Sequence, residues 1–153
     1  MKPSMNRRHV LLSAAALALS VATAAWAAGP MNLDGQGVAI KGHDPVAYFV
    51  DGKPMPGRAE LSHSVGGATY RFANDRNLQA FKSEPAKYLP QYGGYCAYGV
   101  AQGFKPDIDP TAFRIVEGRL YLNLSPAVQS RWLADVPGFV SRANQNWSQL
   151  KDQ

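Results

Sequence analysis

The only cysteine of the chain, Cys96, lies in a segment rich in glycine and tyrosine, YGGYCAYG at residues 92–99. Glycines on both sides let the backbone turn tightly, so this segment can hold a thiol at a defined angle. A soft thiolate suits Cu(I) or Zn(II), and a reactive thiolate can exchange with disulfides. A free cysteine is also among the most buried residue types and packs as a small hydrophobic side chain. These three roles stay open at the level of the sequence.

Two histidines are the candidate partners of Cys96 in a metal site. His43 precedes an Asp-Pro pair, and Asp44 could orient its imidazole, as carboxylates do for metal-ligating histidines. His63 alternates in phase with the apolar residues two positions away on either side, so it points to the same face of a strand as they do. A surface histidine at 43 and a neutral core histidine at 63 are the simpler alternatives. The predicted metal ligands are Cys96, His43 and His63.

Other residue patterns give no basis for catalysis. Asp107 and Asp109 lie in a loop bounded by prolines, but two carboxylates are too few for a calcium site, and turn formation is the simpler role. The chain contains no Ser-His-Asp order, P-loop, HExxH or CxxC pattern, so the sequence does not indicate a hydrolase or a nucleotide-binding protein. No catalytic residue is predicted.

Residues 1–27 have the pattern of an export signal. Basic residues precede the apolar stretch LLSAAALALSVATAA, and AWA at residues 25–27 supplies the small residues that a signal peptidase recognises. The pair Arg7-Arg8 resembles a twin-arginine signal, while the general secretory route is the alternative. We expect cleavage before Ala28, a periplasmic or extracellular location, and no membrane span in the mature chain.

Removal of this segment changes the charge of the chain. The full chain has 16 Lys and Arg and 11 Asp and Glu residues, and the segment carries three of the basic residues and no acid, which leaves a net charge of 13 − 11 = +2. No basic cluster remains that would bind nucleic acid. The rest of the chain is long enough for one domain with its own core, and we expect it to be a monomer.

Hydrophobic alternation and turn residues predict the elements that would position these side chains. Residues 28–36 are expected to be a flexible leader. Residues 61–72 and 113–124 each predict an antiparallel hairpin, because apolar residues alternate on both sides of Gly66-Gly67 and of Glu117-Gly118.

Helices are predicted after each hairpin. One begins after Asn74 or Asp75 and is interrupted at Pro85, and another begins at Ser125, which precedes a proline. No repeat at a fixed period is visible. The predicted fold class is α+β, in which the two hairpins form a small sheet with helices packed against it and a helical segment at the C-terminus.

Several segments, in one order, resemble the exported YHS-domain proteins of bacteria: GHDPVAYF, GGATYRFAN, NLQAFKSEPAKYLPQYGGYCAYG, GRLYLNL and ANQNW. The likeness extends from about Val38 to Trp147 and implies a YHS-type domain over residues 37–153. YHS domains are described as small metal-binding modules, which occur in metal-transport ATPases, in oxygenases and alone. Some exported members contain selenocysteine, which implies redox use. Many YHS domains have cysteines where this chain has Ala47 and Ala73.

Three functions follow as hypotheses. The first is a metal-binding accessory protein, copper favoured over zinc, for which a histidine nitrogen should lie within about 4 Å of the Cys96 sulfur. The second is a thiol redox protein that reacts with a partner's cysteine, for which the sulfur should be exposed near a cation such as Lys105. The third is a non-catalytic interaction module with a buried, structural Cys96. The expected partner in the first two cases is a metal-handling or thiol-redox protein.

Overall fold

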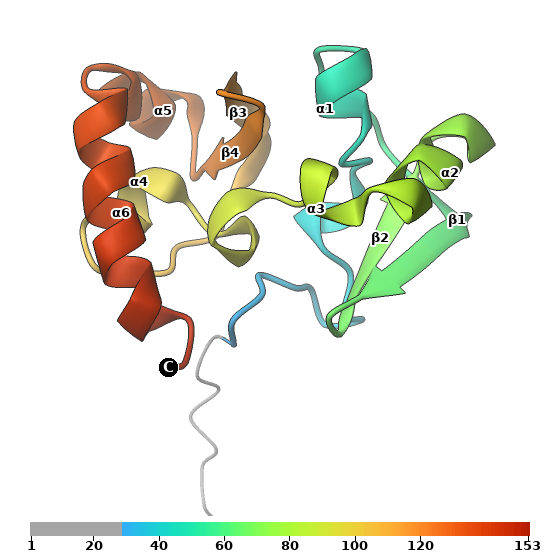
Figure 1. The fold of residues 1–153 in the computed structure, drawn as a ribbon, viewed down its shortest axis with the longest axis horizontal. Coiled ribbons are helices and arrows are strands. Elements are labelled where there is room, and N and C mark those ends of the chain that lie inside the picture. The colour runs from blue at the N-terminus through green and yellow to red at the C-terminus, as the bar shows by residue number, and fades with distance from the viewer. Residues whose placement is uncertain (1–28) are drawn as a thin grey trace, which may run out of the picture.

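The computed structural model describes residues 29–153, so the predicted signal segment lies outside the described residues. Figure 1 shows two groups of helices and strands side by side. We call them the first unit, residues 38–89, and the second unit, residues 90–150. Within residues 29–153, no helix combines the length and the apolar character needed to cross a membrane.

The two units contain six elements each, in the same order. The first unit comprises the 3₁₀ helix η1 (Ile40–Gly42), α1 (Ala47–Val50), β1 (Arg58–Val65), β2 (Ala68–Phe72), α2 (Asp75–Ser83) and α3 (Pro85–Tyr88). The second unit comprises the 3₁₀ helix η2 (Gln91–Gly94), α4 (Ala97–Ala101), β3 (Asp109–Val116), β4 (Arg119–Asn123), α5 (Pro126–Leu133) and α6 (Val136–Leu150). The structure therefore contains a repeated architecture, although no repeat was visible in the sequence.

The repeat holds at the level of residues through both hairpins. β3, β4 and α5 each begin 51 residues after β1, β2 and α2, as from residue 58 to residue 109. The strand pairing is irregular at the same place in both hairpins, between Arg58 and Ser62 in one and between Asp109 and Phe113 in the other. Equal lengths and an equal irregularity indicate that both hairpins follow one template.

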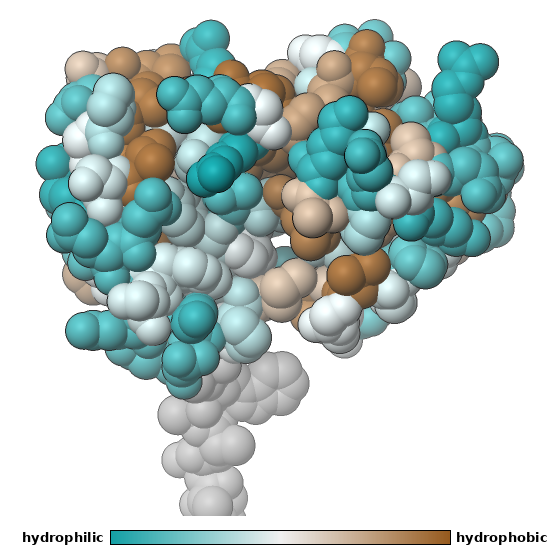
Figure 2. Space-filling view, viewed as in Figure 1, coloured by the Kyte–Doolittle hydropathy of each residue, from teal (hydrophilic) through white to brown (hydrophobic). Residues whose placement is uncertain are grey.

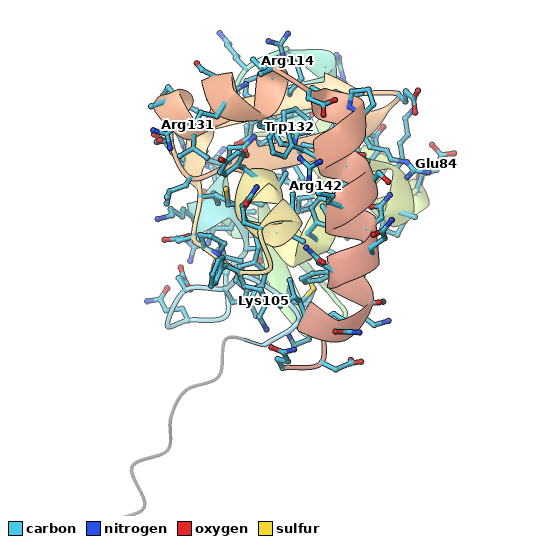
Figure 3. The ribbon with its side chains drawn as sticks, turned by 90° about the vertical axis from the view of Figure 1, so that its left-hand side faces the viewer. Glu84, Lys105, Arg114, Arg131, Trp132 and Arg142 are labelled. Carbon is cyan, nitrogen blue, oxygen red and sulfur yellow. The ribbon has the colours of Figure 1, made fainter. Side chains whose placement is uncertain are left out.

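An aromatic pair joins the second strand to the following helix in each unit. Tyr70 packs against Phe81 with ring centres 5.1 Å apart and planes at 39°, and Tyr121 packs against Trp132 at 5.2 Å and 37°. Trp132 is wholly buried, whereas its neighbour Arg131 lies at the edge of the molecule in Figure 3. These pairs are 51 residues apart and have nearly the same geometry, so the repeat extends to core packing.

Both predicted hairpins are confirmed, but they do not form one sheet. The described residues contain two separate two-stranded sheets. The outer edge of β2 is met by the segment before η1, through a parallel bridge between Val38 and Thr69, and β4 is met by the segment before η2, through a bridge between Pro90 and Leu120. These segments therefore occupy the outer edges of β2 and β4.

The predicted helix starts are confirmed by their caps. The Asn74 side chain accepts a hydrogen bond from the Asn77 amide at 2.9 Å, and Ser125 accepts one from the Val128 amide at 3.2 Å, which satisfies amides that have no partner within a first helical turn. Pro85 separates α2 from α3 as expected. Helices and antiparallel hairpins together confirm the α+β class.

Two hydrophobic clusters form the core, and they meet at the start of α4. Cys96 belongs to the first cluster, with the inward side chains of β2 and α2. Ala97 belongs to the second cluster, with α5 and α6, and Tyr98 packs against both. The segment around Cys96 therefore joins the two halves of the core.

The expected flexible leader is wrong for the described residues 29–36, because this segment is bonded to the second unit. The Asn32 amide donates to the Gly93 carbonyl at 2.8 Å, and the Tyr95 hydroxyl lies 2.8 Å from the Gly29 carbonyl and 3.2 Å from that of Met31. These partners lie more than 60 residues away in the chain, so composition alone did not reveal them.

Candidate functional site

Asp44, which follows His43, is wholly buried and holds the first unit together. Its Oδ1 accepts hydrogen bonds from the amides of Val46 at 2.8 Å and Ala47 at 3.2 Å. Its Oδ2 accepts from the Ala73 amide at 2.8 Å and from Nδ2 of Asn77 at 2.7 Å. A buried carboxylate needs such donors to offset the loss of water. This one links the start of α1 to the end of β2 and to α2.

The Cys96 sulfur is the corresponding acceptor in the second unit. Its residue is 1% exposed, and the sulfur accepts hydrogen bonds from the amides of Gly99 at 3.4 Å and Leu124 at 3.3 Å. The first of these caps α4. The Cys96 amide donates to the Pro106 carbonyl at 3.0 Å. The sulfur is thus bonded within the protein rather than only packed among apolar side chains.

The two acceptors have equivalent partners. Each accepts from the amide three residues later, each accepts from the first amide after the second strand of its hairpin, and each donates its own amide to a carbonyl just before the hairpin. In that order, the equivalent partners are Ala47 and Gly99, Ala73 and Leu124, and Met55 and Pro106. Cys96 therefore occupies the place that Asp44 has in the first unit.

Asn123 completes the surroundings of the sulfur. It is wholly buried, and its Oδ1 accepts from the Tyr98 amide at 3.1 Å and lies 3.6 Å from the Cys96 sulfur. The Tyr98 amide corresponds to that of Val46, which a carboxylate oxygen accepts in the first unit. The carboxylate of Asp44 has two oxygens, whereas the Cys96 sulfur is a single acceptor atom. In the second unit, Oδ1 of Asn123 therefore supplies the additional acceptor, for the Tyr98 amide. Its Nδ2 has no hydrogen-bond partner among the described residues.

Burial controls the protonation of Cys96. Burial raises the pKa of the thiol, and the nearby amides of Gly99, Leu124 and Tyr98 only partly oppose this rise. The thiol is therefore protonated at neutral pH. In this state the S–H group can donate a hydrogen bond to Oδ1 of Asn123. The thiol therefore has partners both as a donor and as an acceptor.

The predicted metal ligands do not form a common group. Within residues 29–153 no three His, Cys, Asp or Glu residues lie close enough together to hold a metal ion. Nδ1 of His43 lies 3.2 Å from the carbonyl oxygen of Ile40, and the ring of His63 lies 6.2 Å from that of Phe81. The structure thus brings neither histidine into a group of three with Cys96, and metal binding stays a prediction.

Three expectations about neighbouring residues can be compared with the structure. The orientation of His43 by Asp44 is wrong, because four other donors occupy that carboxylate. The inward phase of His63 is confirmed, because it is half-buried on the strand face whose apolar residues pack on the core. The exposed sulfur near Lys105 is wrong: the sulfur is buried, and the Lys105 ammonium lies 5.6 Å above the Tyr95 ring.

The local turn role expected for the two loop aspartates is seen for Asp109, whereas Asp107 instead joins distant parts of the chain. Asp107 forms an ion pair with Lys41 at 2.7 Å. Burial raises the pKa of this carboxyl, but hydrogen bonds from Lys41, Asn32 and the Ile108 amide outweigh burial and hold the pKa below its usual value. Asp109 accepts from both the amide and the hydroxyl of Thr111, which fixes the start of β3.

Sequence reasoning missed Asn123 and the acceptor role of Asp44. One signal for Asn123 was present, since it is a polar residue within the apolar run LYLNL. Asp44 gave a weaker signal, because an Asp-Pro pair is common in exposed turns. Only the fold shows that both are buried.

Comparison with known proteins finds one match, which lies mostly in the first unit. Residues 46–92 match the family model of the YHS domain. The match runs from the start of α1 into η2 and ends before Cys96, so it is shorter than the likeness expected from the sequence. Searches of curated proteins and of solved structures found no match to the chain.

Proposed function

We propose that this protein, whose residues 46–92 match the YHS domain, is a non-catalytic interaction module. In this module Cys96 has a structural role. The observation that carries the proposal is that the Cys96 sulfur is buried and accepts hydrogen bonds from two backbone amides. It does so at the position equivalent to that of Asp44 in the first unit. A thiol with a raised pKa and no opening to solvent is a poor nucleophile toward a partner protein.

Among residues 29–153, the geometry supports no group of catalytic side chains. Its exposed large hydrophobic side chains are Val50, Phe104, Leu124 and Leu133, and Figure 2 shows hydrophobic residues scattered in small groups on the visible face. We propose that the protein acts as a monomer outside the cytoplasm, with residues 1–27 as its export signal and a metal-handling or redox protein as its partner. The sequence pattern of that segment supports the location.

Thiol accessibility tests the structural role. A bulky aromatic disulfide reagent should leave Cys96 unmodified in the native protein and modify it fully after denaturation. The positive control is the double variant Cys96→Ser/Ser148→Cys, because Ser148 is exposed on α6. Rapid modification of the native wild type, at a rate near that of the control, would overturn the proposal.

Copper handling is the second candidate, with Cys96 as the main ligand and His43 or His63 as the other. Two observations favour it: YHS domains are generally linked to metal handling, and amide hydrogen bonds to sulfur also support metal-bound thiolates. Zinc is the less favoured ion.

Metal analysis separates the two candidates. The purified protein should contain no stoichiometric copper or zinc, and added Cu(I) should bind equally weakly to the wild type and to Cys96→Ser. One equivalent of tightly held copper that is lost in Cys96→Ser would replace the structural role by the metal role.

A further inference from the structure

We propose that a pocket between the two units binds a small carboxylic acid with an aromatic body, such as an arylacetic acid. The pocket has a volume of about 260 Å³. Its walls come from Pro30 and Met31, from Tyr70 and Leu89 of the first unit, and from η2 and the end of α6. The pocket does not include Cys96, so the inference goes beyond the interaction role and assigns a separate binding site.

Tyr70 brings an unpartnered hydroxyl to the pocket. The residue is 1% exposed, and its hydroxyl forms no hydrogen bond within residues 29–153. Among the same residues, the polar side-chain atoms that are enclosed without a partner are Nδ2 of Asn123 and Nε1 of Trp132. The hydroxyl of Tyr70 is not one of them, so the small exposed part of this residue includes the hydroxyl. Because Tyr70 lines the pocket, a ligand there can meet this group.

Protein contacts fix the two aromatic rings that line the pocket. The Tyr70 ring packs on that of Phe81 with centres 5.1 Å apart. The Trp147 ring packs on those of Tyr92 at 6.0 Å and Tyr95 at 6.2 Å, and its indole N–H has no hydrogen-bond partner in the described part of the chain. The rings are therefore in place before a ligand arrives, which lowers the cost of ordering them on binding.

The segment before η1 is held against η2 and supplies an apolar wall. The Asn32 amide donates to the Gly93 carbonyl at 2.8 Å. Gly93 has a φ angle of 60°, and a Cβ at this position would clash with the carbonyl of Pro30. Glycine thus permits the close approach that keeps Pro30 and Met31 at the pocket, where they and Leu89 can contact the apolar body of a ligand.

The charge at the pocket favours an acid over an amine. Lys151 lines the pocket, and its ammonium has no ion pair or hydrogen bond within residues 29–153. None of the lining residues is acidic, and Asp152, which follows Lys151, is not part of the lining. The Tyr70 hydroxyl, the Trp147 indole and the ammonium are all donors, and a carboxylate offers two acceptor oxygens.

The second unit indicates the apolar part of the ligand. Tyr121, 51 residues after Tyr70, packs against two aromatic rings, those of Trp132 at 5.2 Å and Tyr92 at 6.0 Å. Tyr70 has the ring of Phe81 in place of Trp132, but η1 has no aromatic residue. An aromatic ligand would give Tyr70 the second ring neighbour. The pocket is smaller than the about 300–1,000 Å³ of sites for drug-sized ligands, so one ring suits it.

Binding of phenylacetate to the purified protein, measured by isothermal titration calorimetry, tests the site. Tyr70→Phe removes the hydroxyl and keeps the ring, so the dissociation constant should rise about tenfold through loss of a hydrogen bond to a charged group. Tyr88→Phe is the matched control, because Tyr88 is a buried tyrosine of the first unit that does not line the pocket. This control should leave the dissociation constant unchanged.

The charge of the ligand and of Lys151 is tested separately. Lys151→Gln should raise the dissociation constant about threefold, because an exposed ion pair contributes little. Lys82→Gln, an exposed change on α2, should have no effect. Phenylacetamide has the shape of phenylacetate without its charge and should bind about tenfold more weakly. If Tyr70→Phe does not fold, Lys151→Gln and the amide test the site without changing the core.

Each outcome bears on one part of the inference. No binding of phenylacetate at millimolar concentration, or equal affinity of Tyr70→Phe and the wild type, would overturn the site. Equal affinity for phenylacetate and phenylacetamide would overturn the choice of an acid. None of these variants changes Cys96, so the thiol test of the interaction role is independent of these results.

Discussion

The first and second units place a buried acceptor at the same point of the same template, but they satisfy it differently. Asp44 offers two oxygens and receives four hydrogen bonds. Cys96 offers one sulfur and receives two, and Asn123 takes a third donor while its own Nδ2 has no described partner. A repeated backbone can therefore keep its hydrogen-bond donors while the acceptor changes.

The largest effect is expected from removal of the better satisfied acceptor. Asp44→Ala leaves four donors without their acceptor, so the free energy of unfolding should fall by about 5 kcal/mol, because each unsatisfied buried group costs about 1–3 kcal/mol. Cys96→Ala leaves two amide donors without their acceptor and should lower the free energy of unfolding by about 2 kcal/mol. Urea denaturation measures both. Equal losses would contradict the difference that we draw between the units.

The aromatic pairs should show that both units contribute to the core. Phe81→Ala and Trp132→Ala each remove a wholly buried ring, and each should lower the free energy of unfolding by about 3–5 kcal/mol. Thermal and urea unfolding of the two variants should agree within about 1 kcal/mol of each other. A small loss for Trp132→Ala alone would mean that the second unit packs loosely and is not a true counterpart of the first.

The hairpin turns allow a finer comparison. Gly67 and Gly118 have φ angles of 84° and 72°, so Gly67→Val and Gly118→Val should each cost about 2 kcal/mol, because left-handed backbone is unfavourable for a side chain with a Cβ. Glu117, at φ 50°, replaces the first glycine of the other turn. Glu117→Gly should therefore raise the midpoint of thermal unfolding slightly. Unchanged stability of Gly67→Val would contradict the turn geometry.

The smallest effect is expected from alkaline pH. The pKa of Cys96 is raised by burial in the folded state, so the folded chain holds the thiol proton more tightly than the unfolded chain does. The resulting stability is complete below the unfolded pKa of about 8.5 and is lost as pH rises through the folded pKa. Wild type should lose more stability than Cys96→Ser between pH 8 and pH 10. Buried tyrosines titrate in both proteins, so the difference isolates the thiol; identical pH profiles would show that its pKa is not raised.

The sequence revealed those parts of the fold that depend on neighbours along the chain. The glycine turns and the caps at Asn74 and Ser125 are local signals, and they predicted both hairpins and the helix starts. The repeat was hidden because most equivalent positions carry different residues, such as Phe72 in the first unit and Asn123 in the second.

The candidate site depended on contacts between distant parts of the chain. Cys96 was noticed because of its type, but its burial depends on Leu124 and Asn123, which lie 28 and 27 residues later. The docking of residues 29–36 similarly depends on residues beyond position 90. Such contacts follow from topology, and neither periodicity nor composition encodes them directly.

The matched hairpins also create a hazard during folding. Strands of equal length and equal register can pair with the wrong partner, either within one chain or between two chains that exchange units. Differences between the units oppose this error: a glycine pair in one turn against Glu117-Gly118 in the other, and a small ring at Phe81 against a large one at Trp132. Divergence of the two halves thus protects correct assembly, and variants that make the halves more alike should yield more swapped dimers on refolding.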